Sequence, residues 1–328
     1  MAARRITIES GARLFVLGIL IGLPLAGLGA WWQRHLSATV IHAHIAELGG
    51  WQPADLTVEA GAPLRLRLTS DDVVHGFAIG QSDLPEIEVA PGKTIETTLT
   101  FDKPGKYVFY CTRWCGLGHW RMRGTIEVTG SGADPEAVSP PAYVDLGINL
   151  DAPHDSEAVP QGRPSARRGE SFAPSIAPDF FQTDYYRAHS PVDIWKALKA
   201  KMSEAEAWDA TAYVWEQNTT RERLAEGQRL YAANCTACHG ETGRGDGVAA
   251  SALASQAQTA MTEFGRHTQA PADFTDARRM LGASPALLQG KIIRGGMGTG
   301  MPYWGPIFTD AQTWAVVEYL YTFQFEYH

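Results

Sequence analysis

The chain has few cysteines, and its charge shows no basic excess. Only four cysteines occur among 328 residues. They form two close pairs, Cys111 with Cys115 and Cys235 with Cys238, and both spacings indicate metal or cofactor sites rather than a disulfide framework. The formal net charge is −8 at pH 7, whereas proteins that bind nucleic acid need positive charge to neutralise phosphates. The sequence therefore predicts bound metals or cofactors and no nucleic-acid partner.

Charged residues are absent from residues 14–32. As a helix rising about 1.5 Å per residue, this run would be about 28 Å long, close to the ~30 Å hydrocarbon core of a bilayer. Three arginines precede it: Arg4, Arg5 and Arg13. Because basic flanks stay in the cytoplasm, we expect residues 1–35 to form a single-pass anchor whose N-terminus is cytoplasmic. A cleaved signal peptide is the alternative, although Leu28 makes a poor cleavage site; in both cases everything after Arg34 is exported.

Short β-rich segments separated by turns occupy residues 36–130. The clearest segments are residues 56–59, 64–68, 94–99, 107–110 and 125–128. Turn signals lie between them at Ala60-Gly61, Pro91-Gly92 and Pro104-Gly105. Strands at this spacing predict an all-β domain, an antiparallel sandwich or barrel of Greek-key type.

The loop after the fourth of these segments is rich in soft metal ligands. It carries Cys111 and Cys115, then His119 and Met122. A single copper in a blue site needs one thiolate, two imidazoles and a weak axial sulfur. A second cysteine allows two thiolates to bridge two copper ions, each of which then needs its own imidazole. His119 supplies one imidazole and His75, at the end of an upstream strand, supplies the other, while Met122 and a loop carbonyl complete the coordination shells.

A zinc clip or a pair of reduced core thiols is the alternative for Cys111 and Cys115. Unligated thiols this close together would tend to oxidise in an exported compartment. Neither alternative explains Met122.

The pattern C-x3-C-x3-H-x2-M, with D-V-x-H upstream, resembles the CuA domain of cytochrome c oxidase subunit II over about residues 40–130. The resemblance implies a cupredoxin-like Greek-key fold and a binuclear copper site, CuA. It also implies the ligands, which would be His75, Cys111, the backbone carbonyl of Arg113, Cys115, His119 and Met122.

Arg113 departs from the family pattern. Most oxidases have Glu at this position, and its side chain helps to hold a magnesium or manganese ion at the contact with subunit I. A backbone carbonyl is the same in either residue, so copper binding should survive, but the Mg/Mn site should be absent or rebuilt. The family also usually has two membrane helices in this subunit, and one is visible here.

Residues 234–240 contain a C-x-x-C-H motif, which is typical of covalent haem c attachment. Cys235 and Cys238 would form thioether bonds to the haem, and His239 would be its proximal ligand. A thioredoxin-like redox pair is the alternative, but no βαβ pattern surrounds the motif. Expected helices at 221–234 and 309–323 resemble those that frame the haem of class I cytochromes c, so residues 221–328 are expected to form an all-α cytochrome c domain.

The sixth haem ligand should be a sulfur further along the chain. Met301 and Met297 are the candidates. We favour Met301, because Pro302 disfavours a helix there and favours an extended loop. Ligation by Met and His raises the reduction potential and leaves no open position on the iron, which suits electron transfer.

Residues 131–176 are rich in Pro, Ser, Ala, Gly and Asp and predict a flexible or surface-wrapping linker. Residues 177–220 instead repeat features of the C-terminal domain, and we expect a helical segment, interpreted as half of a degenerate second cytochrome c without an attachment motif. Chance similarity between amphipathic helices is the alternative. The matched pairs are Ser190-Pro191 with Ser284-Pro285, Trp208 with Trp314, and Tyr213 with Tyr319.

Both resemblances imply electron transfer. A chain of this kind would be subunit II of a caa3-like haem–copper oxygen reductase in a bacterial or archaeal plasma membrane, with both redox domains on the outer side. Electrons would pass from a periplasmic donor (a cytochrome c, a cupredoxin or a quinol-oxidising complex) through haem c to CuA, and on to the haems of subunit I. Oxygen would be reduced there, so this chain needs no catalytic residue. The alternatives are the equivalent subunit of a nitric oxide reductase and a stand-alone membrane-tethered carrier.

Overall fold

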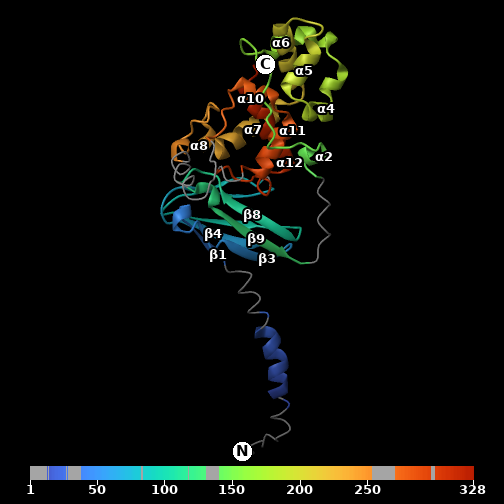
Figure 1. The fold of residues 1–328 in the computed structure, drawn as a ribbon. Coiled ribbons are helices and arrows are strands. Elements are labelled where there is room, and N and C mark those ends of the chain that lie inside the picture. Colours follow the sequence, from blue (N-terminus) through green and yellow to red (C-terminus); the bar gives the residue numbers. More distant parts are fainter. Residues whose placement is uncertain are drawn as a thin grey trace, which may run out of the picture.

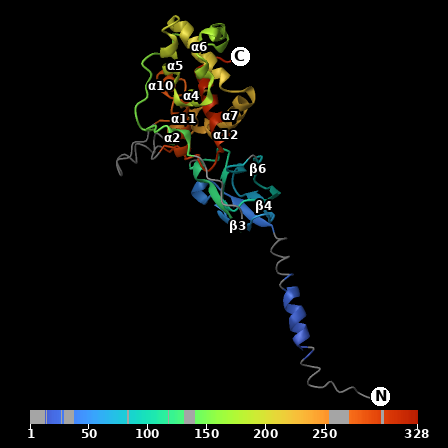
Figure 2. The same ribbon diagram turned by 90° about the vertical axis from the view of Figure 1, so that its right-hand side faces the viewer.

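The computed structural model describes residues 13, 15–26, 28, 38–82, 84–116, 118–130, 140–252, 270–296 and 300–328. Within them, a β domain lies against a larger helical domain (Figures 1 and 2). The all-β and all-α domains follow each other in the expected order. The chain enters the β domain at the end that lies away from the helical domain (Figure 1).

Two mixed sheets make up the described part of the β domain. The four-stranded sheet has the order β2-β1-β4-β7, and the five-stranded sheet has the order β3-β9-β8-β5-β6. All five predicted strands are confirmed. The sheets are not purely antiparallel, because β1 pairs in parallel with β4, and β3 with β9. The strands are β1 (Thr39–Ala43), β2 (Trp51–Gln52), β3 (Asp55–Glu59), β4 (Leu64–Ser70), β5 (His75–Ile79), β6 (Ile87–Val89), β7 (Thr94–Leu99), β8 (Gly105–Cys111) and β9 (Arg123–Thr129).

Apolar side chains from the two sheets form the core of the β domain. Strand β4 alternates buried leucines with exposed arginines, the two-residue period of a half-buried strand. Trp51 meets Phe77 edge-on, with ring centroids 5.5 Å apart, and lies 6.0 Å from Phe109. Burial of one such large apolar side chain stabilises the fold by about 1.5–3 kcal/mol. This packing fixes β5 and β8, the strands at whose ends His75 and Cys111 lie.

Two crossing helices, α7 (Arg221–Asn234) and α12 (Asp310–Leu320), frame the C-terminal part of the helical domain. They approach each other at Gly227, where an added Cβ would lie 2.1 Å from the carbonyl oxygen of Ala315. Glycine is therefore required at this crossing. Both helices lie where the sequence predicts them. The other elements here are α8 (Thr236–His239), α10 (Ala277–Gly282), α11 (Pro285–Arg294) and the 3-10 helix η5 (Tyr321–Phe323).

A second pair of helices, α3 (Ala166–Gly169) and α6 (Glu204–Gln217), crosses in a similar way. An added Cβ at Gly169 would lie 2.0 Å from the carbonyl oxygen of Asp209. Trp215 of α6 packs against Tyr321, with ring centroids 5.6 Å apart, so both pairs share one apolar core. The neighbouring elements are η3 (Glu170–Ser175), η4 (Pro178–Phe181), α4 (Thr183–Ala188) and α5 (Pro191–Leu198).

The described part of the linker wraps over the helical domain. Its short helix α2 (Ala142–Asp145) contacts α11. The carboxylate of Asp151 accepts two hydrogen bonds from Arg294, at 2.8 and 2.7 Å. An added Cβ at Gly282 would lie 1.8 Å from the carbonyl oxygen of His154. These contacts fit the surface-wrapping alternative rather than a free tether.

Residues 15–26 are helical. Among the residues that the structure describes, no helix combines the length and the apolar character needed to cross a bilayer. Parts of the predicted anchor, including Arg4, Arg5 and Arg34, lie outside the described residues. The anchor therefore stays a prediction.

Candidate copper and haem sites

The six predicted copper ligands converge at one end of the five-stranded sheet. His75 begins β5 and Cys111 ends the adjacent strand β8. The chain then turns through Cys115 and the 3-10 helix η2 (His119–Arg121) before β9. Met122 ends this turn, and its backbone N–H donates to the carbonyl oxygen of His119 at 3.0 Å. Two neighbouring strands and one loop thus bring together ligands that are 47 positions apart in the sequence.

The two thiols lie between two imidazoles. The Sγ atoms of Cys111 and Cys115 are 4.0 Å apart. Nδ1 of His75 lies 3.8 Å from Sγ of Cys111, and Nδ1 of His119 lies 3.5 Å from Sγ of Cys115. In the described part of the chain, the ligand atoms of His75, Cys111 and Cys115 all lie within 4.8 Å of one another. Each thiol therefore has its own imidazole, as a pair of thiolate-bridged metal ions would require.

Weaker ligands close the two ends of this cluster. Sδ of Met122 lies 3.2 Å from Sγ of Cys115. The carbonyl oxygen of Arg113 lies 3.2 Å from Sγ of Cys111. The Arg113 side chain is directed elsewhere, because its Nε and Nη1 pair with Glu86 and Glu88 at 3.0 and 2.9 Å. Only the backbone of Arg113 thus faces the thiols, and soft sulfur and imidazole ligands of this kind suit copper.

Asp72 orients the buried imidazole of His75. Its Oδ1 lies 2.7 Å from Nε2 of His75, which leaves Nδ1 directed at the thiols; an outer carboxylate of this kind fixes the tautomer of a ligating histidine. Burial alone would lower the pKa of His75, but its hydrogen bonds to Cys111 and Asp72 outweigh this and raise the pKa. Nε1 of Trp51 donates to the carbonyl oxygen of Met122 at 3.2 Å. This hydrogen bond connects Met122 to the core of the β domain.

The electrostatics of the cluster favour a thiolate at Cys111. Its hydrogen bond with Cys115 lowers the pKa of Cys111 well below its usual range, against the opposing effect of burial. Hydrogen bonds with His119 and His75 lower it further. A thiolate is the form of cysteine that binds metal, so Cys111 is the thiol of this pair that ionises more readily for binding a cation.

The haem-attachment motif lies at the junction of α7 and α8. Cys235 is the C-cap of α7 and precedes α8, which carries Cys238 and ends at His239. Nδ1 of His239 lies 3.0 Å from the carbonyl oxygen of Ala272, and its ring stacks on Phe274 with centroids 4.6 Å apart. Burial lowers the pKa of His239, so its imidazole is neutral and Nε2 can bind iron.

Burial makes both thiols of the C-x-x-C-H motif weaker acids. Burial raises the pKa of Cys235 to about 12 and also raises the pKa of Cys238. The Tyr231 hydroxyl donates to the carbonyl oxygen of Gly240 at 2.7 Å, which braces the turn that follows His239. The turn thus presents two thiols and one neutral imidazole, the groups that a covalently attached haem c uses.

Met301 lies in the loop between α11 and α12. It is partly buried and packs against the apolar cluster of the helical domain. Its carbonyl oxygen accepts a hydrogen bond from the backbone N–H of Gly296 at 3.2 Å. The other sulfur candidate, Met297, lies outside the described residues.

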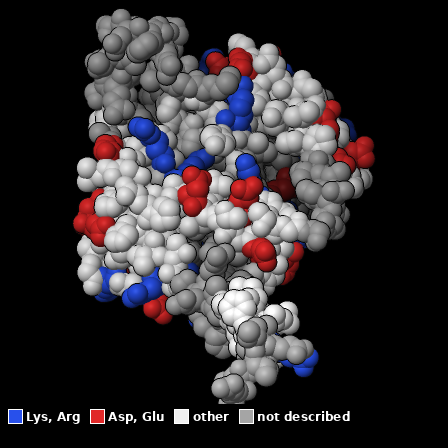
Figure 3. Space-filling model, turned by 90° about the horizontal axis from the view of Figure 1, so that it is seen from below, with Lys and Arg blue, Asp and Glu red and all other residues white. Residues whose placement is uncertain are grey.

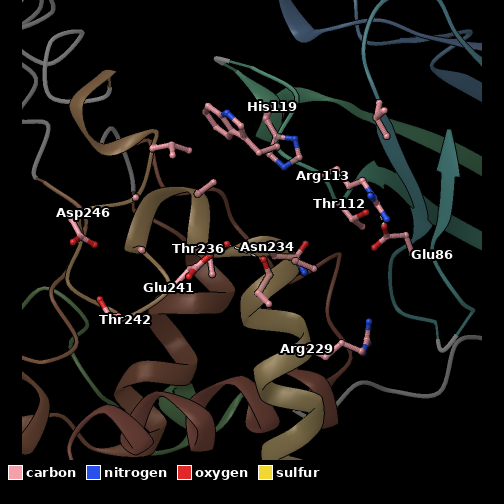
Figure 4. Close-up of a pocket in the computed structure, with 18 of the residues that line it drawn as sticks. Glu86, Thr112, Arg113, His119, Arg229, Asn234, Thr236, Glu241, Thr242 and Asp246 are labelled. Carbon is pink, nitrogen blue, oxygen red and sulfur yellow. Dashed lines mark hydrogen bonds and ion pairs between the residues drawn. The ribbon is translucent and has the colours of Figure 1, made fainter. Parts of the chain in front are cut away.

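A cavity of about 1050 Å³ separates the two groups of predicted ligands. Arg113, Trp114 and His119 line it from the β domain, and Asn234 and Thr236 line it from the haem-attachment turn (Figure 4). Sequence reasoning missed this junction. The signal that could have indicated it is Trp114, a large aromatic residue between the two cysteines, whose ring centroid lies 5.9 Å from that of His119.

Comparisons with known proteins match the two domains separately. Residues 52–129 match the family described as cytochrome c oxidase subunit II, periplasmic domain, and residues 224–324 match the cytochrome c family. Cytochrome c oxidase subunit 2 of Thermus thermophilus is 42% identical over 79 residues, which cover 24% of this chain and 58% of the relative. A second cytochrome c oxidase subunit 2 of Thermus thermophilus is 42% identical over 79 residues, which cover 24% of this chain and 46% of that relative.

A solved structure also resembles the β domain. The periplasmic domain of subunit II of cytochrome oxidase (CoxB) of Bradyrhizobium japonicum is 28% identical, with a TM-score of 0.22, and the match covers 24% of this chain and 55% of that one. The chain spans about half the length of the curated relatives it matches.

Fold and site together define a protein that joins a cupredoxin-like domain to a cytochrome c domain. Its β domain is similar to the periplasmic domain of cytochrome c oxidase subunit II and its C-terminal part to cytochrome c, a combination that resembles a caa3-like fusion.

Proposed function

We propose that this chain is the electron-entry subunit, subunit II, of a membrane haem–copper oxygen reductase. The observation that carries the proposal is one cavity that lies between the two domains, lined on one side by His119 of the copper cluster and on the other by Asn234 and Thr236, the neighbours of Cys235. Two thiols and two imidazoles in alternation support a binuclear CuA site, and the attachment turn supports a covalent haem c.

The ligands of each group are assigned as the sequence indicates. His75, Cys111, Cys115, His119 and Met122 would hold the copper ions with the carbonyl of Arg113, and Cys235, Cys238, His239 and Met301 would hold the haem. When bound, these groups supply single-electron transfer from a periplasmic donor to the haems of subunit I. The protein fixes both sets of ligands on rigid elements, which keeps the rearrangement on each electron transfer small.

The topology supports an arrangement in which the copper domain lies nearer the membrane than the haem domain. The chain enters the β domain at the end away from the helical domain (Figure 1), so an anchor within residues 1–35 would place the copper domain nearer the bilayer and the haem domain further out. The face seen from below carries acidic and basic side chains interspersed (Figure 3). A subunit I that docks there would meet mixed charges, which set orientation more than net attraction.

Oxygen uptake by the complex that co-purifies with a tagged copy of this chain tests the proposal. With reduced cytochrome c as donor, we expect rapid, cyanide-sensitive uptake. Isolation of the chain alone with both cofactors would contradict it and would indicate a free membrane-tethered carrier.

A nitric oxide reductase is the second candidate, and Arg113 is the observation that favours it. Most oxidases have a Glu at this position. In this chain the guanidinium of Arg113 lies there instead and pairs with Glu86 and Glu88. A complex that contains haem, consumes nitric oxide and shows negligible oxygen uptake would establish this candidate instead.

Replacement of Met122 by leucine is expected to change the copper potential without preventing assembly. The leucine fills a similar volume, but it removes the sulfur that lies 3.2 Å from Sγ of Cys115, and axial ligands tune the potential of cupredoxin sites. Redox titration of the copper absorption checks this, and turnover should slow while copper content stays constant. An unchanged potential would exclude Met122 as a ligand.

We also propose that residues 177–220 derive from a second cytochrome c that has lost its haem, and that α3 (Ala166–Gly169), within the predicted linker, belongs to the same relic. Gly169 meets Asp209 and Tyr213 of α6 as Gly227 meets Ala315 and Tyr319 of α12. The glycine crossing thus adds a matched position to the Trp and Tyr pairs in the sequence. From Gly169 to the start of α4 is 14 residues, whereas from Gly227 to the start of α10 is 50, so the segment missing from the first copy includes the equivalent of the attachment motif.

Alanine at either crossing glycine should therefore destabilise the chain. Gly169→Ala and Gly227→Ala should each lower the free energy of unfolding by about 1–3 kcal/mol, because overpacking outweighs the better helix propensity of alanine. Gly162→Ala is the control, since its Cβ would meet nothing within 4 Å. Thermal unfolding followed by circular dichroism measures the difference, and a Gly169→Ala variant as stable as the control would contradict the shared architecture.

A further inference from the structure

The loop of residues 300–308 lies between the two domains and carries Met301. On the side of the helical domain, backbone hydrogen bonds fix it to the end of α11. Trp304 N–H donates to the carbonyl oxygen of Ile292 at 3.1 Å, and Gly305 N–H donates to that of Ile293 at 3.2 Å. The helical domain thus fixes the loop at Trp304 and Gly305.

The β domain holds the other side of this loop through Gln81. The side-chain amide of Gln81 donates to the carbonyl oxygens of Gly305 and, at 2.7 Å, of Phe308. Its backbone N–H donates to the carbonyl oxygen of Ile307 at 2.6 Å. An added Cβ at the preceding Gly80 would lie 2.5 Å from the carbonyl oxygen of Pro306. The side chain and the backbone of Gln81 and the required glycine at position 80 thus all contribute to one contact between the domains.

Gln81 makes this contact in a strained conformation. Its φ is 59°, and among the described residues no other non-glycine residue has a positive φ. A left-handed backbone costs a non-glycine residue roughly 1–2 kcal/mol, and such strain persists where the surroundings over-determine it. Here the surroundings that fix Gln81 include the three hydrogen bonds to the loop.

Arg123 makes the second contact, next to a predicted copper ligand. It follows Met122 directly, and its guanidinium carbon lies 4.9 Å from the ring centroid of Tyr303 and 5.8 Å from that of Trp304. Its Nη1 also donates to the carbonyl oxygen of Tyr303 at 3.1 Å. Tyr303 lies two residues after Met301, so one side chain connects the neighbourhoods of both predicted metal-binding methionines.

We propose that Gln81 and Arg123 are positioning residues for the haem, which hold the loop so that Met301 stays on the iron. The proposal rests on the assignment of Met301 as the sixth haem ligand. A loop that is pre-ordered from both sides loses less conformational entropy when its sulfur binds. Without the contacts from the β domain, states with Met301 detached become more populated, and an external ligand can compete for the iron more easily.

Binding of imidazole to the ferric haem of the full chain tests the proposal. Imidazole must displace the methionine, so its apparent affinity reports how often Met301 is detached. We expect Arg123→Leu and Gln81→Gly each to lower the imidazole dissociation constant about tenfold, the effect of about 1.4 kcal/mol, and to weaken the sulfur-to-iron charge-transfer band. Gln81→Gly tolerates the positive φ and keeps the backbone N–H, so its effect isolates the side-chain amide.

Arg67→Leu is the matched control, because Arg67 lies in the other sheet and pairs with Glu96 at 3.2 Å. Its imidazole affinity should equal that of the unmodified chain, and the copper absorption should be intact in all three variants. Unchanged imidazole affinity in both test variants would overturn the positioning role alone. Absence of the sulfur-to-iron band from the unmodified chain would instead overturn the assignment of Met301, and the positioning role with it.

Discussion

Replacement of Cys111 by serine is expected to abolish the copper centre while leaving the haem in place. Cys111 contacts His75, Cys115 and the carbonyl of Arg113, so its loss removes the bridge between the two halves of the site. A serine hydroxyl is a poor ligand for copper, which prefers sulfur and imidazole. Elemental analysis should show the copper content falling from two ions per haem to one or none, and the absorption of the binuclear centre should disappear.

Thr112→Ser is the matched control for this experiment. It changes the next residue in the chain, whose buried hydroxyl has no hydrogen-bond partner among the described residues, and it should keep both copper ions. If the unmodified chain instead holds one zinc ion and shows no thiolate-to-copper absorption after copper is added, the zinc-clip alternative is correct and CuA is excluded.

Replacement of both Cys235 and Cys238 by alanine is expected to eliminate covalently bound haem. Cys235 precedes α8 and Cys238 lies within it, directly before His239, and each thiol would form one thioether bond. His239 would remain, stacked on Phe274, but one imidazole without covalent attachment holds haem only reversibly. A peroxidase stain of a denaturing gel should detect haem on the unmodified chain and none on the variant.

Thr236→Ser is the control, because it changes the same turn but keeps a hydroxyl that donates to the carbonyl oxygen of Ala232, at 2.9 Å in the native chain. This variant should stain as strongly as the unmodified chain. An unmodified chain that is free of haem after expression with a haem-attachment system, and that forms a Cys235–Cys238 disulfide, would favour the thioredoxin-like alternative. The copper absorption should be unchanged in the double variant, so the two cysteine experiments act as reciprocal controls.

Sequence alone could indicate candidates for both ligand sets because most of these candidates lie close together in the chain. Cys111, Cys115, His119 and Met122 lie within one loop, and Cys235, Cys238 and His239 within one turn. Strand positions followed from β-rich segments and turn residues, and helix positions from the resemblance to class I cytochromes c, as the observed bounds of five strands and of α7 show. A sequence pattern is therefore most predictive where a few neighbouring residues make up most of a site.

The relation between the domains could not be predicted, because it depends on contacts between distant residues with no shared pattern. Gln81 and Phe308 are 227 positions apart, and neither belongs to a motif. The ion pair of Asp151 with Arg294 likewise orders a linker whose composition indicates flexibility. The parallel strand pairs were missed for the same reason, since alternation shows which face of a strand is buried and not which neighbour it pairs with.

Ala78 and Tyr110 belong to strands of the β domain, yet they are buried in the apolar cluster of the helical domain. A shortened chain that ended after residue 130 would expose both side chains to water, together with the partly buried Val108. Such a fragment would be less soluble than the whole chain. The helical domain therefore shields an apolar face of the copper domain from water, in addition to carrying the haem motif.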